Sequence, residues 1–338
     1  MIKQLDEHVS WRRSDMADPD VWTVKLTDEH HSELAKALAV AKAVSSDVLE
    51  LSKDDFPLDT LVDTLKSIDH ELLHGRGFVR ISKLDGDLYS DEDLALLYWG
   101  IGLHLGAPWP QNKHGHVLGD VIDQGKTLKD QESRGNELGA IALDFHTDGS
   151  DYVGLMCLHE AESGGLSLVA NAVAIHNEMV EKRPDLAEAL YEKLPWDFRG
   201  EQPKGGKPYY MRAPFTESDG RFFLFCVPYY IRMSQRHEEA PRLSETQLEA
   251  LTMLEELARS EEMHVAMPLA RGEMQFIYNY HVFHGRTSYV DKQDGHRRHL
   301  KRLWLSSPSL ENRPEQFALQ VEQHWLKKRS ASRMEVAG

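Results

Sequence analysis

Apolar and polar positions alternate with a helical period early in the chain. Leu34, Leu38 and Val40 recur at near-helical spacing within residues 28–44, and Thr27 stands where a helix N-cap is expected. This pattern predicts an amphipathic helix that turns one face toward a core.

Two further helices and one strand are predicted before residue 107. The helices span 59–74 and 91–104; the second follows the N-cap residue Ser90 and ends at Gly106. The short run GFVRI, residues 77–81, lies between these helices and reads as a strand. The chain therefore begins with helices that can cover the outside of a larger core.

Short β-rich runs dominate from residue 116 onward. Each run contains β-branched or aromatic residues and is bounded by Gly, Pro, Asp or Ser. The predicted strands lie in HVLGDVI, GAIALDFH, YVGLMCLHE, LSLVANA, YYMRAPF, RFFLFC, EMQFIYNYHVF and RHLKRLWLSS. Many short strands with few helices between them favour a β-sandwich or barrel over a parallel α/β sheet. The predicted fold class is mostly β with flanking helices.

Two helical stretches interrupt these strands, over residues 173–193 and 245–259. The second begins with Ser244 and Gln247, which have the spacing of a capping box. Its expected buried stripe consists of Leu248, Leu251 and Leu254. Both helices are expected as insertions into the β-rich part of the chain.

A chain of 338 residues is long enough for one large domain or two small ones, and we expect one. Residues 1–75 are expected to form a helical segment that packs on the core, and residues 76–310 the core with its helical insertions. Residues 311–338 are expected to form a C-terminal helix and a frayed tail.

Composition narrows the class of protein. The formal net charge of −16 and the lack of a basic cluster argue against nucleic-acid binding. No apolar run approaches the roughly 20 residues of a membrane span, and the N-terminus lacks the apolar segment of a signal peptide. The two cysteines, Cys157 and Cys226, lie in apolar runs and are expected to be reduced core residues. A cytoplasmic protein with no membrane partner is expected, and a homo-oligomer is compatible with the sequence.

The run FHTDGS, residues 145–150, carries the first indication of chemistry. His146 and Asp148 are two apart at the end of an apolar β run, so their side chains can point to the same side. An imidazole and a carboxylate together suit a first-row divalent metal. A structural alternative is that His146 caps a turn through Asp148.

A third ligand is expected from GEMQFIYNYHVFHGRTSYVD, residues 272–291. His281 and His284 are three apart, so on a straight strand only one of them can face the metal. We favour His284, because Gly285 and Arg286 put it at a rim, and expect His281 to pack or to form a hydrogen bond. Two histidines and one carboxylate leave three positions open, as a non-heme Fe(II) oxygenase needs.

The pair His114 and His116 is a rival indication of a metal. Its flanks are loop-like, and no carboxylate has matching spacing. We therefore expect these two histidines to be structural or to lie on the substrate side.

The run RRHLKRLW, residues 297–304, places Arg298, Leu300, Arg302 and Trp304 on one face of a strand. Arginine binds carboxylates in a two-pronged geometry, so this face is expected to bind an anion. The alternative is that both arginines form structural salt bridges.

Further polar residues are candidates for the substrate pocket. The wall of the pocket is expected to include Trp109, Gln111, Asn112 and Asn279. Arg302, with Arg212 and Arg232 as further candidates, points to a small substrate that bears a carboxylate or resembles an amino acid.

These motifs together resemble the taurine-dioxygenase (TauD/TfdA) family of Fe(II)- and 2-oxoglutarate-dependent oxygenases. The resemblance extends from about residue 75 to 308 and rests on FHTDGS, ESGGLSL, NYHVFHGRTSYVD and RRHLKRLWL in that order. It implies a double-stranded β-helix, or jelly-roll, core. It also implies Fe(II) and O2, with 2-oxoglutarate as the co-substrate that leaves as succinate and CO2.

The resemblance assigns roles residue by residue. His146, Asp148 and His284 match the iron ligands, and Arg298 matches the arginine that holds the distal carboxylate of 2-oxoglutarate. Ser167 stands where the family usually has a threonine, with a shorter spacing from Asp148. Arg302 matches a position that contacts an acidic group of the substrate in several members. Halogenating relatives lack the carboxylate ligand, so Asp148 disfavours halogenation and hydroxylation is expected.

Two other readings remain open on the sequence. A Zn(II)-dependent hydrolase could use the same three ligands, but it would need a general base and gives Arg298 no role. A non-enzymatic jelly-roll module stabilised by a metal would be expected to have lost a ligand or the arginine.

Overall fold

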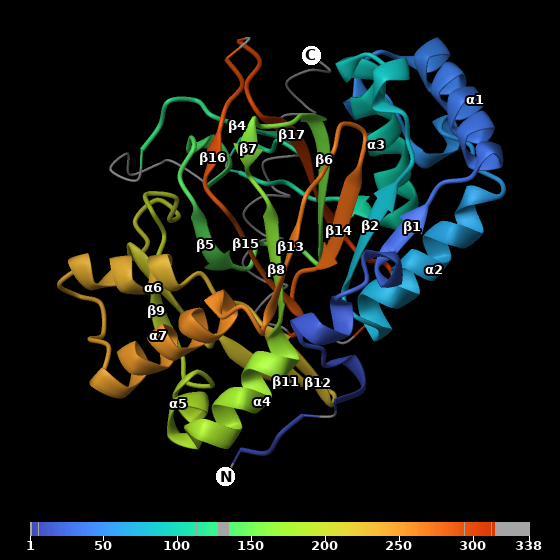
Figure 1. Cartoon of the computed structure of the whole chain (residues 1–338). Coiled ribbons are helices and arrows are strands. Elements are labelled where there is room, and N and C mark those ends of the chain that lie inside the picture. The colour runs from blue at the N-terminus through green and yellow to red at the C-terminus, as the bar shows by residue number, and fades with distance from the viewer. Residues whose placement is uncertain are drawn as a thin grey trace.

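The computed structural model describes residues 2–5, 7–112, 114–127, 135–293, 295–311 and 313–314. Two β-sheets lie at its centre, and the helices α1, α2 and α3 cover the outer side of the larger sheet (Figure 1). The helices are α1 (Asp28–Val44), α2 (Leu61–His74), α3 (Asp91–Leu105), α4 (Ala172–Lys182), α5 (Pro184–Ala189), α6 (Pro228–Met233) and α7 (Glu245–Arg259).

The larger sheet has seven strands in the order β1-β2-β14-β6-β17-β3, and β4 also pairs with β17. All neighbours are antiparallel except β1 and β2. These strands are β1 (Thr23–Lys25), β2 (Phe78–Ser82), β3 (Ala107–Pro108), β4 (Leu118–Ile122), β6 (Tyr152–His159), β14 (Met274–Tyr278) and β17 (His299–Ser306).

The smaller sheet has four antiparallel strands in the order β13-β8-β15-β5. They are β5 (Leu143–His146), β8 (Ser167–Asn171), β13 (His264–Met267) and β15 (Val282–Arg286). Three two-stranded pairs complete the β structure: β7 (Ser163–Gly164) with β16 (Tyr289–Val290), β9 (Leu194–Asp197) with β10 (Tyr209–Arg212), and β11 (Phe215–Ser218) with β12 (Arg221–Leu224). The predicted fold class, mostly β with flanking helices, is confirmed.

Strand β17 shows how the larger sheet connects the helices to the interior. Leu303 and Leu305 are fully buried on the side of α3, where Gly102 lets the helix approach Leu303 closely. The alternate residues Arg302 and Trp304 face the space between the two sheets. Because side chains alternate along a strand, one face of β17 builds the core and the other builds a cavity.

The predicted helix starts are confirmed by their caps. The side chains of Thr27, Ser90 and Ser244 each accept a hydrogen bond from the backbone N–H three residues later. Two of the expected buried positions were wrong, because Val40 is 43% exposed and Leu248 is 40% exposed. Alanines fill the buried faces of these two helices instead, because a short side chain lets each helix pack closely against its neighbours. They are Ala37 and Ala41 in α1, and Ala250 and Ala258 in α7.

Two predicted elements are each divided in the structure. The helix expected over 173–193 is interrupted at Arg183, whose backbone leaves the helical region, because Pro184 disfavours a helical residue before it and itself begins α5. The run EMQFIYNYHVF forms β14 and β15, and residues 279–281 turn the chain from one sheet to the other.

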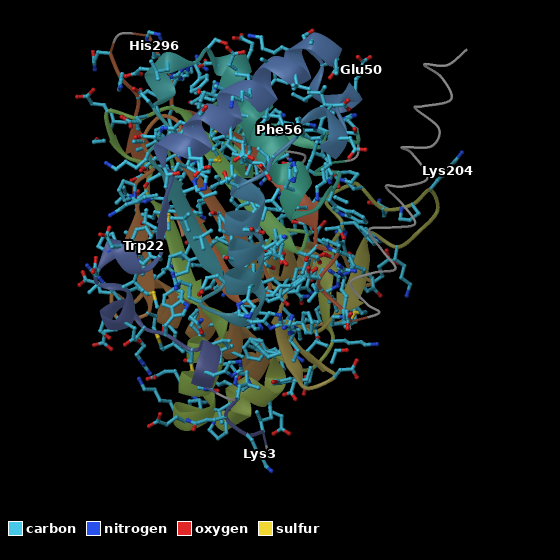
Figure 2. The ribbon with its side chains drawn as sticks, turned by 90° about the vertical axis from the view of Figure 1, so that its right-hand side faces the viewer. Lys3, Trp22, Glu50, Phe56, Lys204 and His296 are labelled. Carbon is cyan, nitrogen blue, oxygen red and sulfur yellow. The ribbon has the colours of Figure 1, made fainter. Side chains whose placement is uncertain are left out.

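The N-terminal segment contributes more than helices, because β1 pairs with β2 at the edge of the larger sheet. The ring of Phe56, in this segment, packs against Gly100 of α3. Figure 2 shows Phe56 within the layer formed by the helices α1, α2 and α3. The division at residues 75 and 310 remains a prediction, and the expected C-terminal helix and tail lie almost entirely outside the described residues. Within the part of the chain that the structure describes, no helix has the length and apolar character needed to cross a bilayer.

Candidate metal centre and cavity

His146 and His284 lie directly opposite each other on the paired strands β5 and β15. Their ring centres are 4.5 Å apart. Asp148 follows in the turn after β5, with Oδ1 4.0 Å from His146 Nε2 and Oδ2 3.8 Å from His284 Nε2. One ligand atom from each residue lies within 4.8 Å of the other two. The structure therefore brings together the three residues that the sequence predicted.

The turn that carries Asp148 is held by Asn279. The Asn279 side-chain oxygen accepts from the Asp148 N–H, and its amide group donates to the backbone oxygens of Asp148 and Ser150. Thr147 is also fixed, through hydrogen bonds to the backbone of Cys226. The carboxylate is thus positioned by a clamped turn and not by the strand geometry that the sequence predicted.

Hydrogen bonding and burial prepare His146 as a metal ligand. Its Nδ1–H donates to the Asp144 carbonyl at 2.8 Å, which leaves the Nε2 lone pair for a metal. Burial, and then the neighbouring His284, lower the pKa of His146 to about 4. His146 is therefore neutral near pH 7, as metal ligation requires.

Asp148 is ionised and held by two donors. Burial works to raise the pKa of its carboxyl, but the Arg302 guanidinium and the two imidazoles hold that pKa well below its usual range. Arg302 Nη1 lies 3.4 Å and Trp304 Nε1 3.0 Å from Asp148 Oδ2. Arg302 and Trp304 thus orient the charged carboxylate.

The donor set fits a ferrous ion. Two imidazoles and one carboxylate suit the ligand preference of Fe(II). Ligand atoms on one face of an octahedral ion, with bonds of about 2.1 Å, are roughly 3 Å apart. The separations of 3.8 and 4.0 Å are about 1 Å longer, so small side-chain movements would close the three residues on one ion.

A cavity of about 850 Å³ opens on these three residues between the two sheets. The larger sheet lines it with Val153, Leu155, Gln275, Ile277, Leu300, Arg302 and Trp304, and the smaller sheet with His146, Ser167, His284 and Arg286. Arg298, just before β17, also lines it, so the face predicted from RRHLKRLW does point into one space. The metal-binding residues therefore belong to the wall of a site large enough for a small molecule.

Arg298 and Arg302 differ in their partners. Arg298 is 7% exposed, donates to the carbonyl oxygen of Gly165 and lies over the ring of Tyr289. Arg302 lies 3.4 Å from Asp148 and donates to the side-chain oxygen of Gln111 at 2.8 Å. A salt bridge is therefore present for Arg302, whereas the acceptor of Arg298 is a neutral carbonyl.

The four candidates for the pocket wall have different positions. Gln111 lines the cavity, and its amide group donates to the backbone oxygens of Val117 and Arg302. Asn279 has no exposed surface, so it lies behind the wall. Asn112 folds back on the backbone N–H groups of the loop that follows it. Trp109 packs against an apolar cluster. Asn112, Trp109 and Asn279 do not line the cavity, which corrects their predicted positions.

The rival histidines lie apart from the three ligands. His281 is buried, its Nε2–H donates to the Phe222 carbonyl, and burial lowers its pKa to about 4. The rings of His114 and His116 face each other 5.9 Å apart, and neither lines the cavity. A substrate-side role for this pair is not supported.

Arg286 is a cavity residue that the sequence reasoning used only to place His284. It is 6% exposed, and burial together with Arg298 lowers its pKa to about 10. Arg286 follows His284 by two positions on β15, so strand periodicity alone puts both on one face. That periodicity could have identified Arg286 from the sequence.

Another part of the cavity wall is aromatic and contains two further arginines. Arg212 is 4% exposed and lies over the rings of Phe225 and Tyr210, whereas Arg232 forms a salt bridge with Glu255. Phe198, Tyr229 and Tyr230 also line this part. In Figure 2, Lys204 marks the outer loop that joins β9 to β10 next to this region.

Comparisons with known proteins agree with this site. Residues 41–304 match the family model described as taurine catabolism dioxygenase TauD, TfdA family. FR-33289 synthase of Streptomyces rubellomurinus is 30% identical over 306 residues, which cover 88% of each chain. The taurine hydroxylase-like protein SAT17 of Stachybotrys chartarum is 28% identical over 314 residues, which cover 89% of this chain and 79% of SAT17.

Solved structures share the fold. An asparagine oxygenase in complex with Fe(II), a hydroxyasparagine and succinate has a TM-score of 0.61 at 18% identity, covering 84% of this chain and 93% of that one. The non-heme iron oxygenase OrfP in complex with Fe and α-ketoglutaric acid has the same TM-score and identity, covering 84% and 94%. The expected jelly-roll core is confirmed, and nothing supports the hydrolase or the non-enzymatic module. The chain belongs to the taurine catabolism dioxygenase TauD, TfdA family and is an Fe(II)- and 2-oxoglutarate-dependent oxygenase.

Proposed function

We propose that this oxygenase hydroxylates an unactivated C–H bond of a small molecule that bears a carboxylate or resembles an amino acid. The observation that carries the proposal is one continuous cavity that contains the His146, Asp148 and His284 side chains and several buried arginines. When bound, Fe(II), 2-oxoglutarate and O2 supply the oxidant for the C–H bond, and the co-substrate leaves as succinate and CO2.

The residues around the cavity have different roles in this reaction. His146, Asp148 and His284 hold the metal, and Arg298 holds the distal carboxylate of 2-oxoglutarate, with Ser167 beside it on the cavity wall. The apolar residues on the same wall exclude water from this space. Asp148 occupies the position that a halide would need, which favours hydroxylation over halogenation.

Two arginines are the best candidates to hold the substrate. Arg302 is kept in place by Gln111 and Asp148, close to the metal ligands. Arg212 lines the cavity and lies over the rings of Tyr210 and Phe225, where an apolar surround strengthens its attraction to an anion. Arg232 is less suited, because it donates to both oxygens of Glu255 at 3.0 and 2.6 Å, a closer pairing than the 3.4 Å contact between Arg302 and Asp148.

The ligands bound in two solved structures of the same fold support an amino-acid-like substrate for this chain. The asparagine oxygenase was solved with 3-hydroxyasparagine, and OrfP was solved with hydroxylated arginine. Both ligands are amino acids that carry a new hydroxyl group on carbon.

A screen for succinate release tests the proposal. The holoenzyme is incubated with Fe(II), 2-oxoglutarate and O2 together with amino acids, amines, sulfonates or aryloxy acids, each acid being paired with its methyl ester. We expect release to be stimulated by a carboxylate-bearing compound and not by its ester, and the product to be heavier by one oxygen atom. Stimulation by esters and acids alike would contradict the proposed substrate class.

The replacement Arg212→Gln separates the two candidate anchors. If Arg212 binds the substrate, its loss raises the KM for the carboxylate-bearing compound by about tenfold or more, because a charged hydrogen bond is lost. Succinate release in the absence of substrate stays unchanged. An unaltered KM would leave Arg302 as the anchor.

A further inference from the structure

Two buried arginines lie against the same tyrosine ring in the cavity. The guanidinium carbon of Arg286 is 4.9 Å from the centre of the Tyr289 ring, and that of Arg298 is 5.2 Å from it. Both side chains line the cavity and are 6% and 7% exposed. One end of the cavity therefore carries two positive charges.

The hydrogen bonds of these arginines go to neutral groups. Arg286 Nη2 donates to the carbonyl oxygens of Gly139 and Ile141, and Arg298 Nη2 donates to that of Gly165. Among the described residues, neither guanidinium has a carboxylate within salt-bridge distance. The Nε–H of Arg286 is buried and has no hydrogen-bond partner in that part of the chain.

Among the described residues, no carboxylate is paired with either guanidinium; Asp123 attracts Arg286 and Asp291 attracts Arg298 only from beyond salt-bridge distance. Two buried cations near one another are unfavourable unless an anion or an acidic side chain compensates them. Arg302, on the same wall, has Asp148 as its counter-charge, so the deficit is specific to the Arg286 and Arg298 end. A bound carboxylate would supply both the missing charge and additional hydrogen-bond acceptors.

We propose that Arg286 is a second arginine for the distal carboxylate of 2-oxoglutarate, and that it shares this carboxylate with Arg298. The inference rests on the proposed role of Arg298. The same two-arginine subsite selects 2-oxo dicarboxylates over 2-oxo acids whose far end is uncharged. Because Arg286 follows His284 by two residues on β15, the strand that presents the metal ligand also presents the charge that fixes the co-substrate at its other end.

A purely structural role for Arg286 makes a different prediction. The hydrogen bonds from Arg286 to Gly139 and Ile141 connect the segment before β5 to β15. If these bonds are all that Arg286 provides, its replacement distorts β15, the strand that carries His284. Such a distortion would weaken the binding of every 2-oxo acid that chelates the metal, whether or not its other end is charged. If Arg286 instead recognises the distal charge, its replacement weakens the binding of the dicarboxylate alone.

The test compares two co-substrates that differ in one carboxylate. The full chain, loaded anaerobically with Fe(II), is titrated with 2-oxoglutarate and with 2-oxopentanoate, and the visible charge-transfer absorption of the chelate reports binding. In Arg286→Gln we expect 2-oxoglutarate to bind about tenfold more weakly or worse, with 2-oxopentanoate unchanged within about twofold. Arg286→Lys keeps the charge and is expected to lie between the wild type and Arg286→Gln.

Two further variants calibrate the result. Arg297→Gln removes an exposed arginine that also donates to a carbonyl, that of Asp123, and should leave both affinities unchanged. Arg298→Gln should weaken the binding of 2-oxoglutarate but not that of 2-oxopentanoate.

The outcomes distinguish the proposed role of Arg286 from that of Arg298. Equal weakening of both ligands in Arg286→Gln, or no weakening of either, would overturn the role of Arg286. If Arg298→Gln alone loses the preference for 2-oxoglutarate, the further inference fails and the proposed function stands. If neither variant loses it, the proposed role of Arg298 fails as well.

Discussion

At the scale of single residues, the metal centre depends on a side chain that is not expected to touch the metal. Asn279 uses its oxygen and its amide group to fix the backbone on both sides of the turn that carries Asp148. The sequence placed Asn279 near the site but assigned it to the pocket wall. An amide side chain gives no indication in the sequence of which backbone groups it will satisfy.

Replacement of Asn279 by alanine should weaken both the fold and the metal site. One backbone N–H and two carbonyl oxygens lose their partner, which costs about 1–3 kcal/mol of unfolding free energy. Loss of the support behind Asp148 should lower metal affinity by roughly 10–100-fold. Urea unfolding and Fe(II) titration under anaerobic conditions measure the two effects.

Asn112 offers a matched control, because its side chain also accepts from two backbone N–H groups but in an exposed loop away from the metal ligands. Asn112→Ala should leave metal affinity unchanged and cost little stability. Equal losses of metal affinity in the two variants would contradict the role assigned to Asn279.

At the scale of elements, α3 packs against its neighbours through two glycines, Gly100 and Gly102, which differ in how well they would accept a larger side chain. A Cβ at Gly100 would lie 2.2 Å from the buried ring of Phe56, whereas a Cβ at Gly102 would meet only a terminal methyl of Leu303, at 2.5 Å. A ring in a closed core cannot move aside, but the end of a leucine side chain can rotate.

Gly100→Ala should therefore lower the unfolding free energy by about 1–3 kcal/mol, as overpacked cores do. Both variants gain about 1 kcal/mol of helix propensity. Gly102→Ala should cost less, because only its clash, with the end of the Leu303 side chain, can be relieved by rotation. Chemical denaturation of both variants gives the comparison. A Gly100→Ala protein as stable as the wild type would show that Phe56 can shift after all.

At the scale of the whole molecule, buried neutral histidines make the fold sensitive to acid. Burial lowers the pKa of His281 to about 4 and also lowers the pKa of His104 and of His176 below the ordinary value. The unfolded chain binds a proton at these positions below about pH 6.5, whereas the folded chain binds it only at a lower pH. Stability is therefore present at neutral pH and declines as the pH falls from about 6.5 toward 4.

For His281 the expected loss between pH 6.5 and 4 is about 3 kcal/mol. Unfolding by urea at pH 7 and pH 5, with metal removed by a chelator, measures the part of this loss that falls within that interval. His281→Gln, which keeps a donor for the Phe222 carbonyl, should reduce the difference between the two pH values. An unchanged difference would rule out His281 as a source of the acid sensitivity.

Metal binding should stabilise the folded chain as a whole. The three ligands come from two strands and a turn that meet only after folding, so a bound ion favours the folded state. Free Fe(II) at 100 times its dissociation constant adds about 2.7 kcal/mol. Anaerobic thermal unfolding should show this gain in the wild type and in His281→Gln but not in His284→Ala. A similar gain in His284→Ala would argue against the assigned ligand set.

The sequence alone determined the local features of this protein. Periodicity and caps located the helices, and the rule that alternate residues share a strand face placed Arg298, Arg302 and Trp304 in one cavity. The spacing in FHTDGS and the choice of His284 over His281 identified the three residues that meet. The caps, the strand faces and the choice of His284 over His281 are readable because they depend on neighbours within a few positions along the chain.

Only the tertiary structure decided which distant groups satisfy one another. Asn279 clamps Asp148 across 131 positions and Gln111 holds Arg302 across 191 positions of the sequence. Arg286 and Arg298 come from one stretch of the chain, but only the folded structure shows that both lie against the Tyr289 ring. Such pairings depend on how two sheets face each other and on which polar groups become buried together. Burial makes each hydrogen-bond partner compulsory, but the identity of the partner is set by the packing of the whole chain.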